Sequence, residues 1–211
     1  MATGLDRMMV RSLMPLPELS AVILSGGQSS RLQGQDKGLI EIAGKPMIEY
    51  VIESISPQVK HLFLSANRHL DVYRRWGFEV FSDADPEGFQ GPLAGLLMAL
   101  IRTPTDWLLS VPCDVPFLPD TLVEKLLSAV QADKYDCVVV SVEGAMQPVC
   151  VLCHRRVSAA LQQFLMSGQR KTGLFLRQQR LCLVDFPDDG HTFRNINTPS
   201  DVRWLEQAVL K

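Results

Sequence analysis

The stretch SAVILSGGQSSRLQGQDKGL, residues 20–39, joins an apolar run to a segment that is rich in glycine and poor in large side chains. The apolar run is typical of a strand that is buried on both faces. Glycine lets the backbone approach a phosphate closely because no Cβ stands in the way, and successive N–H groups in such a turn form a concavity that suits an anion. Arg31 and Lys37 add positive charge. The stretch therefore predicts a phosphate-binding loop directly after a buried strand.

This loop matches neither of the two commonest phosphate-binding patterns. Neither G-x-x-x-x-G-K-[ST] nor G-x-G-x-x-G can be laid on its residues. The missing dinucleotide fingerprint disfavours a nicotinamide-dependent dehydrogenase. A glycine-rich surface loop with incidental charges is the alternative interpretation. The position after a buried strand, and the return to an ordered pattern at residues 38–46, favour the phosphate loop.

Apolar runs of strand length alternate with helical patterns along the rest of the chain. This alternation predicts an α/β fold with a doubly wound, mostly parallel, Rossmann-like sheet and helices on both faces. Ligands of such sheets bind outside the carboxyl ends of the strands. The expected strands are residues 20–25, 61–66, 78–83, 107–112, 137–143, 148–153 and 181–186. The expected helices are residues 46–55, 91–101, 119–130, 157–166 and 199–209.

Length and composition indicate one domain. The chain has 211 residues, of which 46% are hydrophobic and 21% charged, and we expect one domain over residues 19–211 after a loose arm over residues 1–18. The net charge of −2 disfavours nucleic acid as a partner, because phosphate neutralisation needs a basic surface. Without a signal peptide or an apolar stretch of about 20 residues, a soluble, cytoplasmic protein without a membrane partner is expected.

The five cysteines are expected to be reduced thiols, because their number is odd and no secretion signal precedes them. Two of them lie in CVLCH, residues 150–154, which matches the C-x-x-C-H pattern of c-type haem attachment. The surrounding residues are typical of a buried strand, in which positions i and i+3 point to opposite faces. We therefore expect Cys150 and Cys153 to belong to the core rather than to a haem or metal site.

Further motifs follow the glycine loop in a fixed order along the chain. With the loop itself they are residues 24–37, 44–55, 65–69, 91–100, 111–119, 147–148, 167–172 and 195–201, with a lone aspartate at Asp83. These ordered motifs resemble those of the MobA-like molybdenum cofactor guanylyltransferases, a family within the nucleotidyltransferases. The glycine pair at Gly26-Gly27 is the MobA-like form, where related cytidylyltransferases more often show AAG. The similarity covers about residues 20–210, and ordered blocks across a whole domain are far more specific than one glycine loop.

The resemblance implies a nucleotide-diphospho-sugar transferase-like fold and a GTP-dependent, Mg²⁺-dependent reaction. A phosphate of molybdopterin would attack the α-phosphorus of GTP, and pyrophosphate would leave. An anionic phosphate is already a competent nucleophile, so positioning and charge neutralisation would carry the catalysis. The expected partners are GTP and molybdopterin, with transient contacts to other cofactor-biosynthesis or acceptor proteins, and the chain is expected to be a monomer.

Asp114 follows an apolar strand, so its carboxylate should emerge at the carboxyl edge of the sheet beside the glycine loop. Mg²⁺ accepts one or two carboxylates together with phosphate oxygens, whereas an aspartate in this place can also simply turn a loop. The resemblance makes Asp114 the expected Mg²⁺ ligand. The expected catalytic residues are Arg31, Lys37 and Asp114. The expected nucleotide-binding residues are Leu24, Ser25, Gly26, Lys37, Ser65, Asp83 and Asp114.

Ser65 departs from the family pattern, because many relatives carry asparagine there. A single hydroxyl replaces a two-sided amide and weakens the case for a base contact. Asn67 would face the same way if the strand continued. Guanine preference is therefore implied by the resemblance alone.

The acceptor side has several candidates. The helix start at Gly91-Pro92 could receive an anion or let a flat pterin approach, and Asn195 and Asn197 share one face of an extended segment. NTP, residues 197–199, is equally an ordinary helix start, with Thr198 as the cap. Two further residues, Arg170 and Lys171, would contact acceptor phosphate or remain solvated.

Two alternatives remain open from the sequence. The first is a nucleotidyltransferase that uses CTP, or a sugar phosphate as acceptor. The second is a non-catalytic nucleotide-binding module in a regulatory assembly, which the intact pair of Lys37 and Asp114 disfavours.

Overall fold

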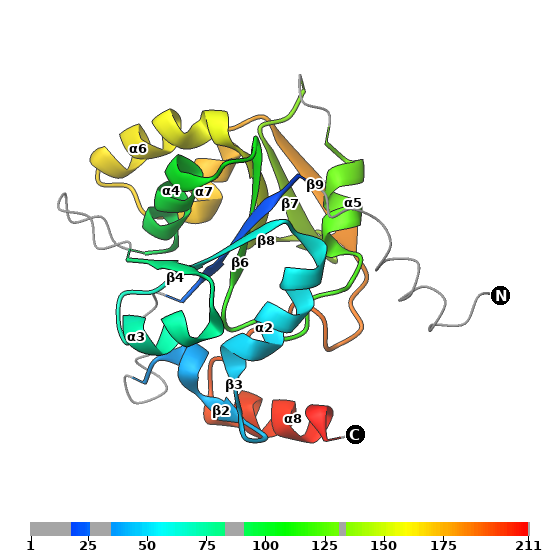
Figure 1. Ribbon diagram of the computed structural model, residues 1–211. Coiled ribbons are helices and arrows are strands. Elements are labelled where there is room, and N and C mark those ends of the chain that lie inside the picture. Colours follow the sequence, from blue (N-terminus) through cyan, green and yellow to red (C-terminus); the bar gives the residue numbers. More distant parts are fainter. Residues whose placement is uncertain (1–17, 26–34, 83–90, 131–133, 211) are drawn as a thin grey trace.

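A computed structural model describes residues 18–25, 35–82, 91–130 and 134–210 (Figure 1). The expected N-terminal arm lies outside these residues except for Glu18, so the boundary of the domain stays a prediction. No helix in the described ranges is both long and apolar enough to cross a membrane.

The centre of the fold is a seven-stranded sheet in the order β5-β4-β1-β6-β8-β7-β9. The pairs β4/β5, β1/β4, β1/β6 and β7/β9 are parallel, and only β8 runs antiparallel to its two neighbours. This confirms the mostly parallel α/β sheet. The strands are β1 Ser20–Leu24, β4 His61–Ser65, β5 Glu79–Phe81, β6 Trp107–Pro112, β7 Cys137–Val142, β8 Ala145–His154 and β9 Leu181–Phe186, and a separate hairpin pairs β2 Glu41–Ile42 with β3 Lys45–Pro46.

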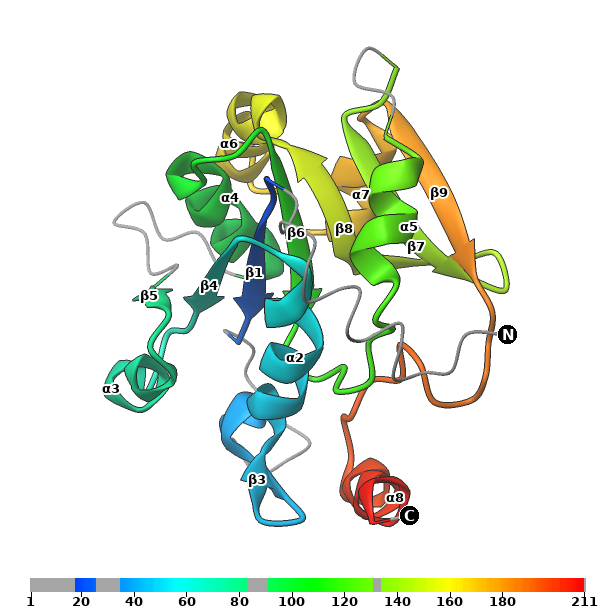
Figure 2. The ribbon, with the colours of Figure 1, turned by 45° about the vertical axis from the view of Figure 1, so that its right-hand side comes forward.

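Helices cover both faces of the sheet (Figure 2). The α-helices are α2 Met47–Ile55, α3 Leu70–Tyr73, α4 Pro92–Arg102, α5 Leu122–Ser128, α6 Ser158–Met166, α7 Thr172–Arg177 and α8 Pro199–Val209. The short 3-10 helices are η2 Lys37–Leu39, η3 Ser56–Gln58, η4 Arg74–Trp76 and η5 Arg155–Val157. One core cluster lies between the sheet and the helices α2 and α5, and a second lies between the sheet and α4, α6 and α7. Burial on both faces explains why the strands are continuously apolar.

Each expected strand and helix is present, although several ends differ. The helix expected over residues 119–130 is shorter, since α5 runs only from Leu122 to Ser128. Pro46 is the residue that caps α2 rather than a member of its first turn. The sequence patterns missed α3 and α7, which have four and six residues. Helices this short show too few turns for a periodic pattern.

The start of α8 confirms the expected helix signal. The Thr198 side chain accepts a hydrogen bond from the Asp201 N–H, and the Asp201 carboxylate accepts one from the Thr198 N–H, which forms a capping box. Pro199 occupies the first helical position, where its missing N–H costs nothing. This arrangement fixes the backbone directly before the helix.

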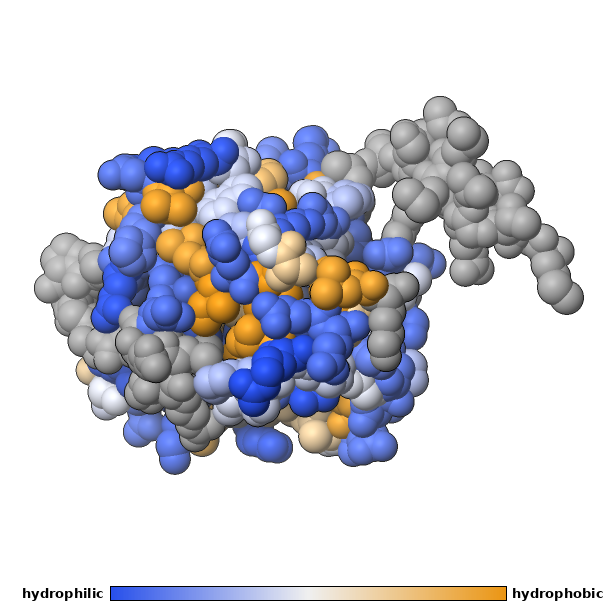
Figure 3. Space-filling view, turned by 90° about the horizontal axis from the view of Figure 1, so that it is seen from below, coloured by the Kyte–Doolittle hydropathy of each residue, from blue (hydrophilic) through white to orange (hydrophobic). Residues whose placement is uncertain are grey.

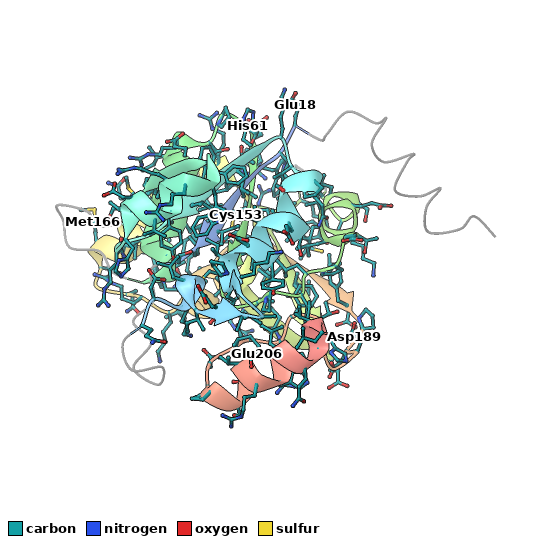
Figure 4. All side chains as sticks on the ribbon, turned by 60° about the horizontal axis from the view of Figure 1, so that its bottom comes forward. Glu18, His61, Cys153, Met166, Asp189 and Glu206 are labelled. Atoms are coloured by element: carbon teal, nitrogen blue, oxygen red, sulfur yellow. The ribbon has the colours of Figure 1, made fainter. Side chains whose placement is uncertain are left out.

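The strand interpretation of CVLCH is confirmed. Cys150 packs in the core cluster that contains α2 and α5, and Cys153 packs in the opposite cluster. Cys153 lies in the interior, as Figure 4 shows. The ring of His154 packs edge-on against Trp107, with 5.0 Å between the ring centroids. The motif is therefore part of β8 and its packing.

A charged cluster formed by Asp136, Arg156 and Arg180 lies where β7 and β9 begin and β8 ends, and it leads to a stability prediction. The Asp136 carboxylate accepts hydrogen bonds from Arg180 and Arg156, and the Arg180 guanidinium, followed by that of Arg156, holds the pKa of Asp136 well below its usual range. Because the unfolded chain then binds the proton more readily, this carboxylate stabilises the fold above about pH 4, and the contribution is lost as the pH falls.

We expect Asp136→Asn to lower the free energy of unfolding at pH 7 by about 1 kcal/mol, because the pairs are partly exposed. Thermal unfolding of both proteins between pH 7 and pH 3 measures this, and the difference in Tm should shrink at the acid end. Asp71→Asn, in an exposed pair with Arg74, is the control and should change Tm little. A difference that is constant with pH would contradict the prediction.

Candidate active site

A cleft lies at the carboxyl ends of β1, β4 and β6. From β1 the chain runs to β4 and β5 on one side of β1 and then crosses to β6 on the other side. The strand order therefore reverses at β1, and sheets of this kind bind ligands at such a point. The cleft has a volume of about 400 Å³. Figure 3 shows this edge of the molecule, with apolar side chains gathered in a hollow between polar ones. The lining residues are Leu24, Lys37, Ser65, Gly91, Pro92, Pro112, Cys113, Asp114, Val115, Gln147, Pro148, Val149, Cys150, Phe193 and Asn195.

Lys37 and Asp114 meet in this cleft although 77 positions separate them in the sequence. The Lys37 ammonium donates a hydrogen bond of 2.9 Å to Asp114 Oδ2, and the side chains are 19% and 15% exposed. The same ammonium donates to Asn197 Oδ1 at 2.5 Å. The structure thus brings together Lys37 and Asp114, two of the expected catalytic residues. Asn197, which is expected on the acceptor side, binds Lys37 directly.

The segment that carries Lys37 is held by a half-buried aspartate next to it. Asp36 caps the short helix η2, and its Oδ1 accepts hydrogen bonds from the Gly38 N–H at 3.2 Å and from the Tyr73 hydroxyl at 2.6 Å. Tyr73 comes from α3 and is fully buried. Its hydroxyl lies only 2.5 Å from the place that a Cβ on Gly38 would occupy. Glycine at this position therefore makes room for the hydrogen bond that holds the lysine segment.

Burial dominates the electrostatics around this contact. Desolvation raises the pKa of Asp36, although the hydrogen bonds from Tyr73 and Gly38 oppose the shift. Burial, together with Cys113 and Asp36, also raises the pKa of Tyr73. The phenol therefore stays protonated and acts as a donor at neutral pH.

The Asp114 main chain is held between two segments of the cleft. The neighbouring Cys113 N–H donates to the Leu24 carbonyl at 3.1 Å, which extends the pairing of β1 with β6. The Asp114 carbonyl accepts the Ile196 N–H at 2.8 Å. The carboxylate thus emerges at the carboxyl edge of β6, as its position after an apolar strand predicts.

Leu24 and Ser65 also lie in the cleft, and Ser25 lies beside it. The Ser25 N–H donates to the Ser65 carbonyl at 2.7 Å. The Ser25 hydroxyl is buried and makes no hydrogen bond within the described part of the chain. The Ser65 side chain is almost fully buried against Gly95 of α4, where an added Cβ would lie 2.7 Å from Ser65 Oγ. Gly95 therefore permits the close approach of α4 to β1 and β4.

Not all of the expected site residues lie in the described part of the cleft. Gly26, Arg31 and Asp83 lie outside the described residues. Asn67 does not continue the face of Ser65, because β4 ends at Ser65. Asn67 is exposed, and its side-chain oxygen accepts a hydrogen bond from Ser82 at 2.9 Å.

On the acceptor side, Gly91, Pro92 and Asn195 line the cleft. Arg170 and Lys171 are exposed and are not among the described lining residues. Arg170 donates to the carbonyl of Leu165 at 2.7 Å. The structure therefore does not bring these two basic residues to the cleft.

Sequence reasoning missed the apolar wall formed by β8 and the segment before α8. Val149, Cys150 and Phe193 belong to this wall. Burial, followed by the Asp114 charge, raises the pKa of Cys150 to about 12, so its thiol is neutral. The sequence signal that could have found Cys150 is its spacing, because residues two apart on a strand share a face and Pro148 also lines the cleft.

The donor set of the cleft suits a metal ion that is bound mainly through a substrate. Asp114 is the only carboxylate among the described lining residues. The described ranges contain no group of three or more His, Cys, Asp or Glu side chains that could hold a metal ion. Mg²⁺ needs few protein ligands, since it keeps waters and binds phosphate oxygens, so one carboxylate fits this ion better than Zn²⁺.

Comparisons with known proteins agree with this geometry. A family model described as a MobA-like NTP transferase domain matches residues 21–182. A molybdenum cofactor guanylyltransferase of Shewanella amazonensis is 42% identical over 191 residues, which cover 90% of this chain and 97% of the relative. A molybdenum cofactor guanylyltransferase of Shewanella frigidimarina is 41% identical over 195 residues, which cover 92% and 99%.

Solved structures show the same fold at lower identity. Molybdopterin-guanine dinucleotide biosynthesis protein A from Archaeoglobus fulgidus has a TM-score of 0.74 at 22% identity, covering 90% of this chain and 98% of that chain. CMP:2-keto-3-deoxy-manno-octonic acid synthetase complexed with CTP has a TM-score of 0.74 at 14% identity, covering 92% and 98%. At these identities the likeness concerns the nucleotidyltransferase fold alone.

Proposed function

The chain belongs to the MobA-like NTP transferase family and is a nucleotidyltransferase, and we propose that it transfers GMP from GTP to the phosphate of molybdopterin, with release of pyrophosphate. The relatives that match it over nine tenths of its length are named for this guanylyl transfer. The observation that carries the assignment in this chain is the meeting of Lys37 and Asp114 in the cleft at the switch point of the sheet.

The reaction asks for positioning and charge neutralisation rather than proton abstraction, because the attacking phosphate is already anionic. The Lys37 ammonium lines the cleft and would offset charge on the triphosphate and on the leaving pyrophosphate. Arg31, outside the described residues, would bind phosphate with its planar guanidinium. The apolar wall of β8 would exclude water from the acceptor side.

Asp114 would hold Mg²⁺ through a carboxylate oxygen. The bound ion would neutralise phosphate charge and orient the phosphate oxygens. Lys37 contacts Oδ2 of Asp114, so the other carboxylate oxygen, Oδ1, would serve the cation while the two cations share the negative charge. The requirement for Mg²⁺ is part of the proposal.

The nucleotide base would lie beside the ends of β1 and β4. Backbone groups of Leu24, Ser25 and Gly26 would read it, and Asp83 would accept N–H donors of guanine or a ribose hydroxyl. The Ser25 hydroxyl lies beside the Tyr73 hydroxyl and the Cys113 thiol without a regular hydrogen bond among the described residues, which supports a polar ligand next to this segment. Ser65 would support this segment mainly through its carbonyl, which accepts the Ser25 N–H, because its side chain is buried against α4.

The experiment combines purified protein, GTP, MgCl₂ and molybdopterin, and it measures pyrophosphate release together with the guanylated pterin. We expect product with GTP and none without the divalent cation. Thermal shifts with the four nucleoside triphosphates form a second measurement, in which GTP should stabilise the protein most. Product from CTP or from a sugar phosphate would replace the proposal with that reaction. Binding of GTP without turnover would favour a regulatory nucleotide-binding module.

A cytoplasmic location and a monomeric state stay predictions. Transient contacts with proteins that supply or accept the cofactor are predictions of the same kind.

A further inference from the structure

The Lys37 ammonium has three N–H groups, and two of them are occupied inside the protein. One donates to Asp114 Oδ2 at 2.9 Å and one to Asn197 Oδ1 at 2.5 Å. Among the described residues the third N–H meets no acceptor, which leaves it for a ligand in the cleft. Asn197 thus binds a lysine that lies 160 positions away in the sequence. Because its side chain is a neutral amide, Asn197 does not offset the charge of the lysine.

The main chain around Asn197 is held by a dense set of hydrogen bonds. The Asp201 carboxylate accepts the Asn197 N–H at 3.2 Å and the Thr198 N–H at 2.9 Å. The preceding residue, Ile196, is fully buried and donates its N–H to the Asp114 carbonyl. The segment is therefore fixed from both sides, and the amide oxygen of Asn197 is presented by a rigid backbone rather than by a free loop.

We propose that Asn197 is a positioning residue for Lys37: its amide oxygen fixes the ammonium beside Asp114, and it thereby couples the acceptor-side segment before α8 to the phosphate-binding side of the cleft. This inference rests on the proposed function. It assigns to Asn197 a role in nucleotide binding, through Lys37. The two interpretations from the sequence are a contact with the pterin and an ordinary position before the cap of α8.

The chemistry of an amide suits this role. When Asp114 engages a cation, the cation competes with Lys37 for its negative charge, and the lysine needs a second acceptor to keep its place. A neutral oxygen supplies that acceptor without drawing the cation away from the phosphates. An aspartate at this position would add a second negative charge beside Lys37 and would repel the triphosphate.

The test measures GTP affinity in the presence of Mg²⁺ and without any acceptor, by titration calorimetry. We expect Asn197→Ala to weaken GTP binding about three- to tenfold, as the loss of one ordinary hydrogen bond predicts, because the residue acts on the ligand only through Lys37. Asn197→Asp should weaken it further. In a Lys37→Ala background, Asn197→Ala should have little additional effect, because the residue acts through the lysine.

Thr198→Ala is the matched control. It removes the side-chain cap of α8 but leaves the Asn197 amide, so Tm should fall while the affinity for GTP stays within about twofold. Equal weakening by Thr198→Ala and Asn197→Ala would overturn the proposal, since the effect would then come from the helix start. An unchanged GTP affinity of Asn197→Ala with a raised KM for the pterin would also overturn it. Absence of GTP binding in the unmodified protein would instead contradict the proposed function.

Discussion

Asp114→Asn is expected to lower the rate of pyrophosphate release by roughly 10²- to 10³-fold at saturating GTP. The change keeps the size of the side chain but removes the negative charge that would hold Mg²⁺ and that pairs with Lys37. Lys37 keeps its hydrogen bond to Asn197, so the cleft should remain formed. The Tm should fall only modestly, because Lys37 keeps one acceptor and asparagine can still offer its amide oxygen to the lysine.

The measurement compares initial rates of pyrophosphate release over a range of MgCl₂ concentrations. Asp106→Asn is the matched control, because this exposed aspartate directly precedes β6 at the opposite end from Asp114. It should keep the rate of the unmodified protein. Full turnover by Asp114→Asn would contradict the assignment of Asp114, even if the protein still bound GTP.

The sequence predicts much of the site because the carboxyl ends of neighbouring parallel strands meet at one edge. The apolar runs that become β1 and β6 place Ser25 and Asp114 at that edge before any side-chain contact is known. The family resemblance adds Lys37. Local pattern therefore predicts where Asp114 emerges, the resemblance predicts that Lys37 belongs to the same site, and the structure brings the two side chains together.

The missed features depend on contacts that no local pattern encodes. The hydrogen bond from Tyr73 to Asp36 joins a four-residue helix to a loop, and that helix is too short to be seen in the periodicity. The wall at Cys150 arises because β8 runs antiparallel to β6, so its first half, rather than its end, reaches the cleft. A mostly parallel prediction places the wrong end of this strand there.

Gly38→Ala is expected to destabilise the fold by about 2–4 kcal/mol and to lower the rate of pyrophosphate release with it. The backbone of η2 is helical, so alanine itself is permitted there. The added Cβ would instead lie 2.5 Å from the Tyr73 hydroxyl, and Tyr73 is fully buried and bonded to Asp36, so the clash would fall on that hydrogen bond. The strain would displace the tyrosine from Asp36, and Lys37 next to it would lose its fixed position.

The second variant, Tyr73→Phe, separates this clash from a general intolerance of change at Gly38. It removes the hydroxyl, after which the nearest ring carbon, Tyr73 Cζ, lies 3.4 Å from the position of the added Cβ, an ordinary contact. Tyr73→Phe alone should destabilise the fold by about 1–3 kcal/mol, because Asp36 loses a buried donor. In that background, Gly38→Ala should cost much less than in the unmodified chain, so urea unfolding of the four proteins should give costs that do not add. Additive costs would mean that the hydroxyl does not occupy the space of the missing Cβ, and that the contact between Tyr73 and Asp36 does not determine the residue at position 38.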